Sequence, residues 1–219
     1  QRWFPAGRTL VTGNPIRAAF FQGGAEQAGL RPNFTILVFG GSQGAQRINR
    51  IMKEALDHLP HLKNRLAFIH QTGEGDRESV AAAYGDKGFT AEVVPFITDM
   101  AAAYRRADLL ICRAGATTIA EITAGGKASI LIPYPFAVND HQSKNAEVLS
   151  RAGAAEVAAE RDLSGARLAS LIDRLQGDPD TLRNMAGAAA RLGNPDAAKT
   201  IVDACLLLLD QRRRRTDHR

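Results

Sequence analysis

The sequence predicts an α/β domain built on a doubly wound parallel sheet, and three observations lead to this fold class. Short apolar runs alternate with stretches of helical periodicity along most of the chain. Glycine turns follow two of the apolar runs, at Gly40-Gly41 and at Gly115. Gly-Asp-Pro and Gly-Asn-Pro then separate three helical stretches near the end. Strands that alternate with helices form parallel sheets covered on both faces, so we expect ligands beyond the carboxyl ends of the strands.

Each element has its own signal in the sequence. Apolar runs of strand length predict strands at residues 9–11, 34–39, 66–70, 91–94, 108–112, 128–132 and 154–158. Helical patterns predict helices at residues 45–59, 74–84, 99–106, 116–123, 141–151, 163–175, 180–192 and 196–209. Pro133 and Pro135 end the strand before them because proline donates no ladder hydrogen bond. Asp140 is in position to be the N-cap of the helix that follows it.

Composition limits the class of protein. The chain has 219 residues, 45% of them hydrophobic, which is enough for a sizeable core. No apolar run approaches the roughly 20 residues needed to span a bilayer, and no secretory signal is visible. Cys112 and Cys205, the only two cysteines, fit reduced thiols better than a disulfide framework. We therefore expect a soluble, cytoplasmic protein.

The net charge of +5 is concentrated at the end of the chain, where residues 210–219 carry +3. We expect a domain over residues 1–209 followed by a basic disordered tail over 210–219. Such a tail could also touch nucleic acid or an anionic membrane. The body has no basic stripe interleaved with aromatic residues, so a nucleic-acid partner is not expected.

The turn at Arg113–Gly115 is the strongest local signal for a binding site. It joins an apolar run to a helix with almost no loop, so the first N–H groups of the helix can meet a ligand. This arrangement favours an anion, most naturally a phosphate, near Ala116, Thr117 and Thr118. Glu121 lies one helical turn beyond Thr117 and could accept two hydrogen bonds from a ribose. The alternative is that Glu121 is an ordinary solvated residue of the helix.

A second glycine turn, residues 40–44, also joins an apolar run to a helix, as in phosphate-binding loops. Its spacing has neither the G-x-G-x-x-G pattern nor the G-K-[ST] ending of a P-loop. His70 and Gln71 end the next strand, where a dinucleotide fold would place an acidic residue. An ordinary NAD site is therefore not expected. No Cys/His cluster has metal-ligand spacing, and we expect neither a metal nor a cofactor.

Polar residues outside these turns add to the prediction. Arg17 follows the Gly13-Asn14-Pro15 turn and could reach a phosphate, or it could be an ordinary surface arginine. His141, Gln142 and Asn145 lie around the first turn of one helix, and such side chains can both donate to and accept from sugar hydroxyls. The alternative is a capped surface helix.

Several longer motifs together point to a known family. They are VTGNPIR at 11–17, FGGSQGAQRIN at 39–49, QTG at 71–73, PFITDMAAAYRRADLLICRAGATTIAEI at 95–122 and IPYPFAVNDHQSKNA at 132–146. In this order they resemble the C-terminal half of the MurG family of glycosyltransferases, which move N-acetylglucosamine from UDP-N-acetylglucosamine (UDP-GlcNAc) to a lipid-linked muramoyl-pentapeptide. The resemblance covers residues 9 to about 153 and implies the Rossmann-like C-terminal domain of a GT-B enzyme.

The resemblance also implies a role for individual residues. Ser42 in the GGSQG loop would lie against the donor, with Arg17 near its phosphates. Phe96, Ile97 and Met100 would border the uracil. The diphosphate would bind at residues 114–118 and the ribose at Glu121. His141 and Gln142 would contact the sugar, although some members of the family have two glutamines there, so His141 could instead support the loop.

The remaining expectations concern what lies outside the chain. Because the chain begins at Gln1 with a sequence typical of a protein interior, we expect a fragment. The family's acceptor site and candidate general base lie in an N-terminal half, so we expect no catalytic base here and no transfer by this chain alone. The helix at 196–209 would pack on that half, which would bring the enzyme to lipid I at the inner face of the membrane. The alternatives are a separate donor-binding subunit, or another GT-B enzyme of UDP-sugars such as an epimerase or hydrolase.

Overall fold

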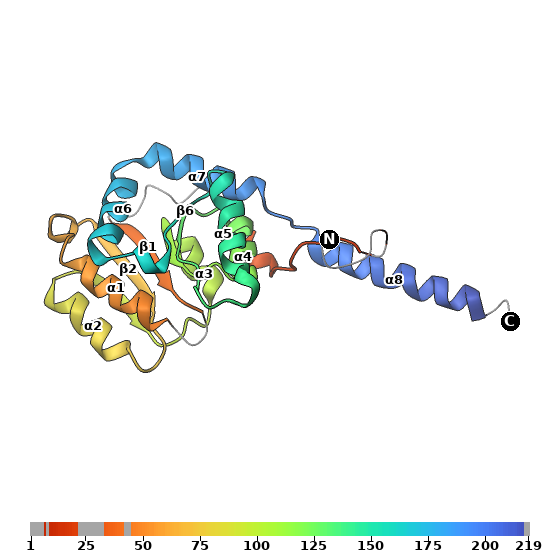
Figure 1. Ribbon diagram of the computed structural model, residues 1–219, viewed down its shortest axis with the longest axis horizontal. Helices are drawn as coiled ribbons and strands as arrows, with labels where there is room; N and C mark the ends of the chain where they lie inside the picture. Colours follow the sequence, from red (N-terminus) through yellow and green to blue (C-terminus); the bar gives the residue numbers. More distant parts are fainter. Residues whose placement is uncertain (1–6, 8, 22–32, 42–44, 217–219) are drawn as a thin grey trace.

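The protein contains a six-stranded parallel sheet in the order β3-β2-β1-β4-β5-β6 (Figure 1). The computed structural model describes residues 7, 9–21, 33–41 and 45–216, with side chains through residue 210. The strands are β1 (Phe34–Phe39), β2 (Leu66–Gln71), β3 (Thr90–Val94), β4 (Leu109–Cys112), β5 (Ser129–Leu131) and β6 (Ala155–Val157). This is the strand order of doubly wound nucleotide-binding sheets. The predicted fold class is therefore confirmed.

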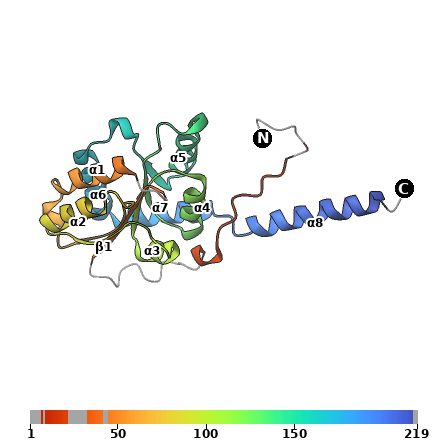
Figure 2. The ribbon, with the colours of Figure 1, turned by 90° about the horizontal axis from the view of Figure 1, so that it is seen from below.

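Helices cover both faces of the sheet, and one further helix extends away from it (Figures 1 and 2). They are α1 (Gln46–Leu56), α2 (Arg77–Asp86), α3 (Met100–Arg106), α4 (Ala116–Gly125), α5 (His141–Arg151), α6 (Gly165–Gly177), α7 (Pro179–Arg191) and α8 (Ala197–Thr216). The core of one face includes side chains of α1, α2 and α6, and that of the other includes side chains of α3, α4 and α5. Helix α7 contributes to both.

Alternation along the strands explains the two cores. In β1, Ile36 and Val38 belong to the first core, whereas Leu37 and Phe39 belong to the second. Successive side chains of a strand point to opposite faces, so a strand covered on both sides is apolar throughout. All four of these residues are at most 4% exposed. The continuous apolar runs of the sequence therefore predict buried central strands correctly.

Helices α1 and α6 approach each other at Gly165, the first residue of α6. A Cβ atom at this position would lie 2.4 Å from the Cβ of Glu54 and 2.6 Å from its carbonyl carbon. Backbone atoms cannot move aside as a flexible side chain can. The glycine is thus required by the packing of the two helices and not by an unusual backbone angle.

Helix α8 extends from the body into solvent, and it runs further than the sequence predicted (Figures 1 and 2). Between residues 197 and 210, Ala197 is the only buried residue. Residues 210–216, expected to belong to a disordered tail, are helical; glutamine and arginine are good helix formers, and arginine suits a helix C-terminus. No helix in the described part of the chain is long and apolar enough to cross a membrane.

Two local expectations were wrong. Residues 9–17 form no strand, and Leu10 and Val11 are 61% and 73% exposed, because no strand of the described residues pairs with this segment. Asp140 does precede α5, but its side chain makes no capping hydrogen bond. Asn139 and Asp140 both have positive φ, 53° and 55°. This left-handed backbone replaces the extended N-cap geometry that a capping side chain needs.

A buried polar network joins β2 to α1 and α2. His70 is fully buried, and its Nδ1 lies 3.1 Å from the Tyr84 hydroxyl while its Nε2 lies 3.0 Å from Asn49 Oδ1. Asn49 donates in turn to the Thr72 carbonyl at 2.9 Å and to Asp76 at 2.8 Å. Burial lowers the pKa of His70 from its usual 6.5 to about 3. The network therefore holds a neutral histidine.

We expect His70 to make the domain less stable in acid. The unfolded chain takes up a proton near pH 6.5 and the folded chain only near pH 3, so stability falls as the pH decreases through this window. Between pH 7.5 and 5.5 the loss from this group should be about 1.4 kcal/mol. Urea unfolding of the unsubstituted chain and of His70→Gln at both pH values would measure it. If the free energy of unfolding depended on pH equally in the two proteins, the low pKa of the folded-state His70 would be contradicted.

Candidate functional site

Two turns leave the sheet side by side at the point where its strand order reverses. Phe39, the last residue of β1, pairs with Cys112, the last residue of β4. The chain after β1 leads to α1 on one face, and the chain after β4 leads to α4 on the other. In doubly wound sheets, ligands bind in the crevice outside such a point. The two predicted glycine turns therefore flank one potential binding site.

The start of α4 offers unused hydrogen-bond donors to this site. The backbone N–H groups of Gly115, Ala116, Thr117 and Thr118 make no hydrogen bond with any described residue, whereas the N–H of Ile119 donates to the Gly115 carbonyl at 2.9 Å. Ala116 and Thr117 are exposed, and Thr118 is half-buried. Free N–H groups at the positive end of a helix dipole attract anions. The geometry therefore fits the predicted phosphate contact.

Glu121 lies on α4 next to Arg17 and Tyr104. Its side chain is half-buried, and burial raises the pKa of its carboxyl. The positive charge of Arg17 and the hydroxyl of Tyr104 lower the pKa and partly offset this effect. Glu121 is therefore half-buried, with Arg17 and Tyr104 close to its carboxyl. The structure brings Arg17 and Glu121, which are far apart in sequence, to the same side of α4.

Aromatic contacts hold Arg17 and Tyr104 in place. The Arg17 guanidinium carbon lies 5.4 Å from the centre of the Phe20 ring, and Phe20 packs edge-on against Tyr104 at 5.1 Å between ring centres. Tyr104 is 2% exposed, and burial raises the pKa of its hydroxyl, with Cys112 and Glu121 raising it further. This hydroxyl has no hydrogen-bond partner of ordinary geometry among the described residues. It nevertheless lies close enough to Glu121 to affect the pKa of that carboxyl.

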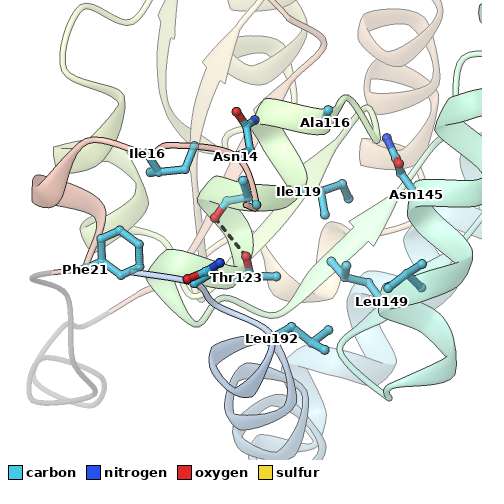
Figure 3. Close-up of a pocket in the computed structure, with 13 residues that line it drawn as sticks. Asn14, Ile16, Phe21, Ala116, Ile119, Thr123, Asn145, Leu149 and Leu192 are labelled. Carbon is cyan, nitrogen blue, oxygen red and sulfur yellow. Dashed lines mark hydrogen bonds between the residues drawn. The ribbon is translucent and has the colours of Figure 1, made fainter. Parts of the chain in front are cut away.

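A cavity of about 290 Å³ lies on the other side of α4 (Figure 3). Its walls come from the N-terminal segment, α4, α5 and the residues after α7, and they include Asn14, Ile16, Ala116, Ile119, Thr123, Asn145, Leu149 and Leu192. Thr117, Thr118 and Glu121 do not line it. The side of α4 that carries Thr117 and Glu121 therefore faces away from this largely apolar cavity.

The predicted uracil residues lie at the end of β3. Phe96 is 57% exposed at the rim, while Ile97 and Met100 are half-buried against the core that contains Leu37 and Phe39. The side chain of Asp99 caps α3 by accepting from the N–H of Ala102 at 2.9 Å. Ile97 and Met100 thus pack on the α3 side of the sheet, and Phe96 precedes them in the chain.

The start of α5 is bound to the turn before α4. Gln142 Oε1 accepts from the N–H of Ala114 at 3.2 Å and from that of Tyr134 at 3.0 Å. Asn145 Nδ2 donates to the Ala114 carbonyl at 3.0 Å. The side-chain oxygen of Gln142 therefore supports the turn, and its Nε2 has no partner among the described residues. His141 is exposed, with Nδ1 2.7 Å from the Val138 carbonyl.

Arg113 is the first residue of the turn before α4, and its side chain is held by several buried contacts. Its guanidinium donates to the carbonyls of Ile132 and Pro133 at 3.2 and 3.3 Å and forms an ion pair with Glu160 at 2.5 Å. The guanidinium also lies over the Tyr134 ring at 5.3 Å. Arg113, a buried residue, thereby ties β4 to the chain after β5. Its role is missed by sequence reasoning, because the family motif shows the residue but not its partners.

The structure thus brings most of the predicted site together. Arg17 lies beside Glu121 of α4, and Thr117 and Thr118 belong to the same helix. Ile97 and Met100 pack into the core on the face of the sheet that α4 covers. Ser42 lies outside the described residues. Among the described residues, no group of three or more His, Cys, Asp or Glu is arranged to hold a metal ion.

Comparison with known families agrees with this geometry. The sequence model of the glycosyltransferase family 28 C-terminal domain matches residues 35–201. The chain belongs to this family. The matched part of this glycosyltransferase domain extends from β1 into α8 and includes both glycine turns and α4.

Full-length relatives are longer than this chain. It is 56% identical over 208 residues to the UDP-N-acetylglucosamine–N-acetylmuramyl-(pentapeptide) pyrophosphoryl-undecaprenol N-acetylglucosamine transferase of Syntrophus aciditrophicus, covering 95% of this chain and 58% of the relative. The Myxococcus xanthus protein of the same name is 50% identical over 96% of this chain and 55% of its own length. The chain therefore spans a little over half the length of these curated relatives.

Solved structures show the same architecture. The crystal structure of MurG from Acinetobacter baumannii matches with a TM-score of 0.77 and 36% identity, covering 92% of this chain and 56% of the other. The co-structure of Staphylococcus aureus MnaA with UDP matches with a TM-score of 0.59 at 13% identity, over 82% of this chain and 47% of that one. At that identity the second match shows the fold alone.

Proposed function

We propose that this glycosyltransferase domain binds the donor UDP-GlcNAc and forms one half of an enzyme that transfers N-acetylglucosamine to a lipid-linked muramoyl-pentapeptide, converting lipid I to lipid II. The free N–H groups at the start of α4, next to the half-buried Glu121, carry this proposal. The relatives named as N-acetylglucosamine transferases supply the donor and the acceptor by similarity.

The proposed arrangement assigns each part of the donor to a group of residues. The diphosphate lies at the N–H groups of residues 115–118 with Arg17 nearby, and the ribose bonds to Glu121. The uracil lies by the patch of Phe96, Ile97 and Met100, with Ser42 against the donor. The sugar lies toward His141 and the free Nε2 of Gln142. Because Gln142 Oε1 already serves two backbone amides, this side chain can donate to the sugar but has little capacity to accept.

The proposed reaction is a single displacement with inversion at the anomeric carbon. The acceptor hydroxyl forms the new C–O bond, the bond to the diphosphate breaks, and UDP leaves with the electron pair. The acceptor proton goes to a base that we place in an N-terminal half outside this chain. Negative charge grows on the diphosphate, where oriented N–H groups and the Arg17 cation stabilise it without reorganising. We propose that the complete enzyme works at the cytoplasmic face of the membrane, where its acceptor resides.

Calorimetry with the 219-residue chain tests the donor site directly. We expect UDP and UDP-GlcNAc to bind, and ADP to bind more weakly because the base patch does not fit a purine. We also expect no transfer of sugar from UDP-GlcNAc to lipid I by the chain alone. A chain that binds neither uridine nucleotide would contradict the proposal.

We further propose that one side of α8 packs on that N-terminal half. Val202, Leu206 and Leu209 are each 54–55% exposed and lie along one side of the helix with the half-buried Ile201. Leu207 is 62% exposed and lies on the opposite side. Exposed apolar surface of this extent on a projecting helix is typical of an interface.

A pair of substitutions in a full-length protein that includes the N-terminal half tests the α8 interface. We expect Leu206→Glu to lower both the thermal midpoint and the transferase activity, because it places a charge in a buried contact. Leu207→Glu should leave both nearly unchanged, and neither should affect the 219-residue chain, where both leucines are exposed. Equal effects of the two substitutions in the full-length protein would contradict the proposal that the Leu206 side of α8 packs on the N-terminal half.

A further inference from the structure

One buried side chain connects the two loops on either side of β2. Gln71, the last residue of β2, is 1% exposed. Its Nε2 donates to the Gly41 carbonyl at 2.7 Å, and its Oε1 accepts from the N–H of Ile97 at 2.8 Å. Gly41 belongs to the turn after β1, and Ile97 belongs to the loop after β3. The carboxamide of Gln71 therefore links the residues that follow β1 and β3, the two strands on either side of β2.

The strand register explains why Gln71 can reach both loops. Gln71 pairs with Phe39 of β1 on one side and with Val94 of β3 on the other, so the three strands end at one level. Adjacent strands lie about 4.8 Å apart, which places the two outer chains about 10 Å from each other. The carboxamide has a donor at one atom and an acceptor at the other, which is what a carbonyl on one side and an N–H on the other require.

We propose that Gln71 is a positioning residue for nucleotide recognition, which fixes the distance between Gly41, just after β1, and the loop at Phe96–Ile97. The inference rests on the proposed function, which places the base of the donor beside the loop at Phe96–Ile97. Gln71 acts through the backbone of Gly41 and Ile97 and does not itself touch the reacting atoms. A fixed gap width admits a pyrimidine and disfavours a larger base, so Gln71 contributes to base preference as well as to affinity.

The hydrogen bond between Tyr84 and His70, the neighbour of Gln71 in β2, offers a matched control. His70 points to the opposite face of the sheet, where Tyr84 supplies a buried hydrogen bond to it at 3.1 Å. Tyr84→Phe removes this bond, keeps the ring and lies in the core that faces away from the proposed site. Gln71→Met keeps the length of the side chain and removes both bonds, whereas Gln71→Glu keeps the acceptor for Ile97 and loses the donor to Gly41.

Nucleotide titrations of the full 219-residue chain test the inference. We expect Gln71→Met to bind UDP about tenfold more weakly and its preference for UDP over ADP to fall by a similar factor. Gln71→Glu should lie between this variant and the unsubstituted chain. Tyr84→Phe should lower the thermal midpoint and leave both the affinity and the preference unchanged. A role limited to stability would lower the midpoint in all three variants without altering base preference.

Amide exchange in the nucleotide-free chain provides a second measurement. The Ile97 N–H should exchange about tenfold faster in Gln71→Met, since its acceptor is lost, and at an unchanged rate in Gln71→Glu and Tyr84→Phe. Unchanged exchange in Gln71→Met would overturn the inference, as would unchanged affinity and base preference. If the unsubstituted chain binds no UDP, the proposed function fails and this inference fails with it. If that chain binds UDP and Gln71→Met binds it equally well, only the inference fails.

Discussion

Replacing Arg113 with methionine should lower the free energy of unfolding by about 3–5 kcal/mol, because it leaves a buried carboxylate without its partner. The Arg113 and Glu160 side chains are only 10% and 16% exposed. The substitution also removes the donor to the carbonyls of Ile132 and Pro133. Methionine keeps most of the side-chain volume, so a cavity contributes little to the loss. Urea unfolding followed by circular dichroism measures the change.

A surface pair provides the control for this result. Arg174 lies 2.7 Å from Glu156, with side chains 49% and 38% exposed, and Arg174→Met should cost no more than about 1 kcal/mol. The double variant Arg113→Met/Glu160→Gln should recover part of the loss, since it removes the unpaired charge. Equal effects of Arg113→Met and Arg174→Met would show that the Arg113 pair does not support the turn.

Replacing Glu121 with alanine should weaken binding of UDP and of UDP-GlcNAc by about 10- to 100-fold, since hydrogen bonds to a charged group contribute about 1.5–3 kcal/mol. Glu121 is half-buried beside Arg17 and Tyr104, so its carboxyl is partly shielded from water before a ribose arrives. Glu121→Gln, which keeps one acceptor, should have a smaller effect. Calorimetry with both ligands measures these changes.

Glu147 provides a matched control for Glu121. It lies on α5 in an exposed pair with Arg151, so Glu147→Ala should bind both nucleotides as the unsubstituted chain does. Thermal unfolding of each variant separates lost binding from lost folding. A Glu121→Ala variant that folds and binds UDP with unchanged affinity would refute the ribose contact, even if the anion site at the start of α4 remains.

Much of the fold could be predicted because its signals are local. The run FTILVF becomes β1, and the prolines after β5 end it as expected. The expected strand at residues 9–11 failed, since a strand needs a partner and no local pattern shows whether one is available. The expected end of the last helix at Leu209 was too early, because the arginine run was interpreted through its charge and not through its helix propensity.

The site could be predicted in part for a related reason. The spacing of Thr117 and Glu121 within one helix is visible in the sequence, and so is the short turn before α4. The contacts of Gln71 with Gly41 and Ile97 are not, because they depend on the register of three strands that are far apart along the chain. Gln142 shows the same limit: its motif indicates a polar helix start, but not that its oxygen is already used by two backbone amides.

The segment between α7 and α8 is bound to the N-terminal segment that leads to Arg17. Asn194 donates to the Thr12 carbonyl at 3.0 Å, and Gly13, with φ at +79°, leaves no room for a side chain against Asn194. The chain that leads to Arg17 is therefore attached to the residues just before α8, so the two segments share one anchor on the domain.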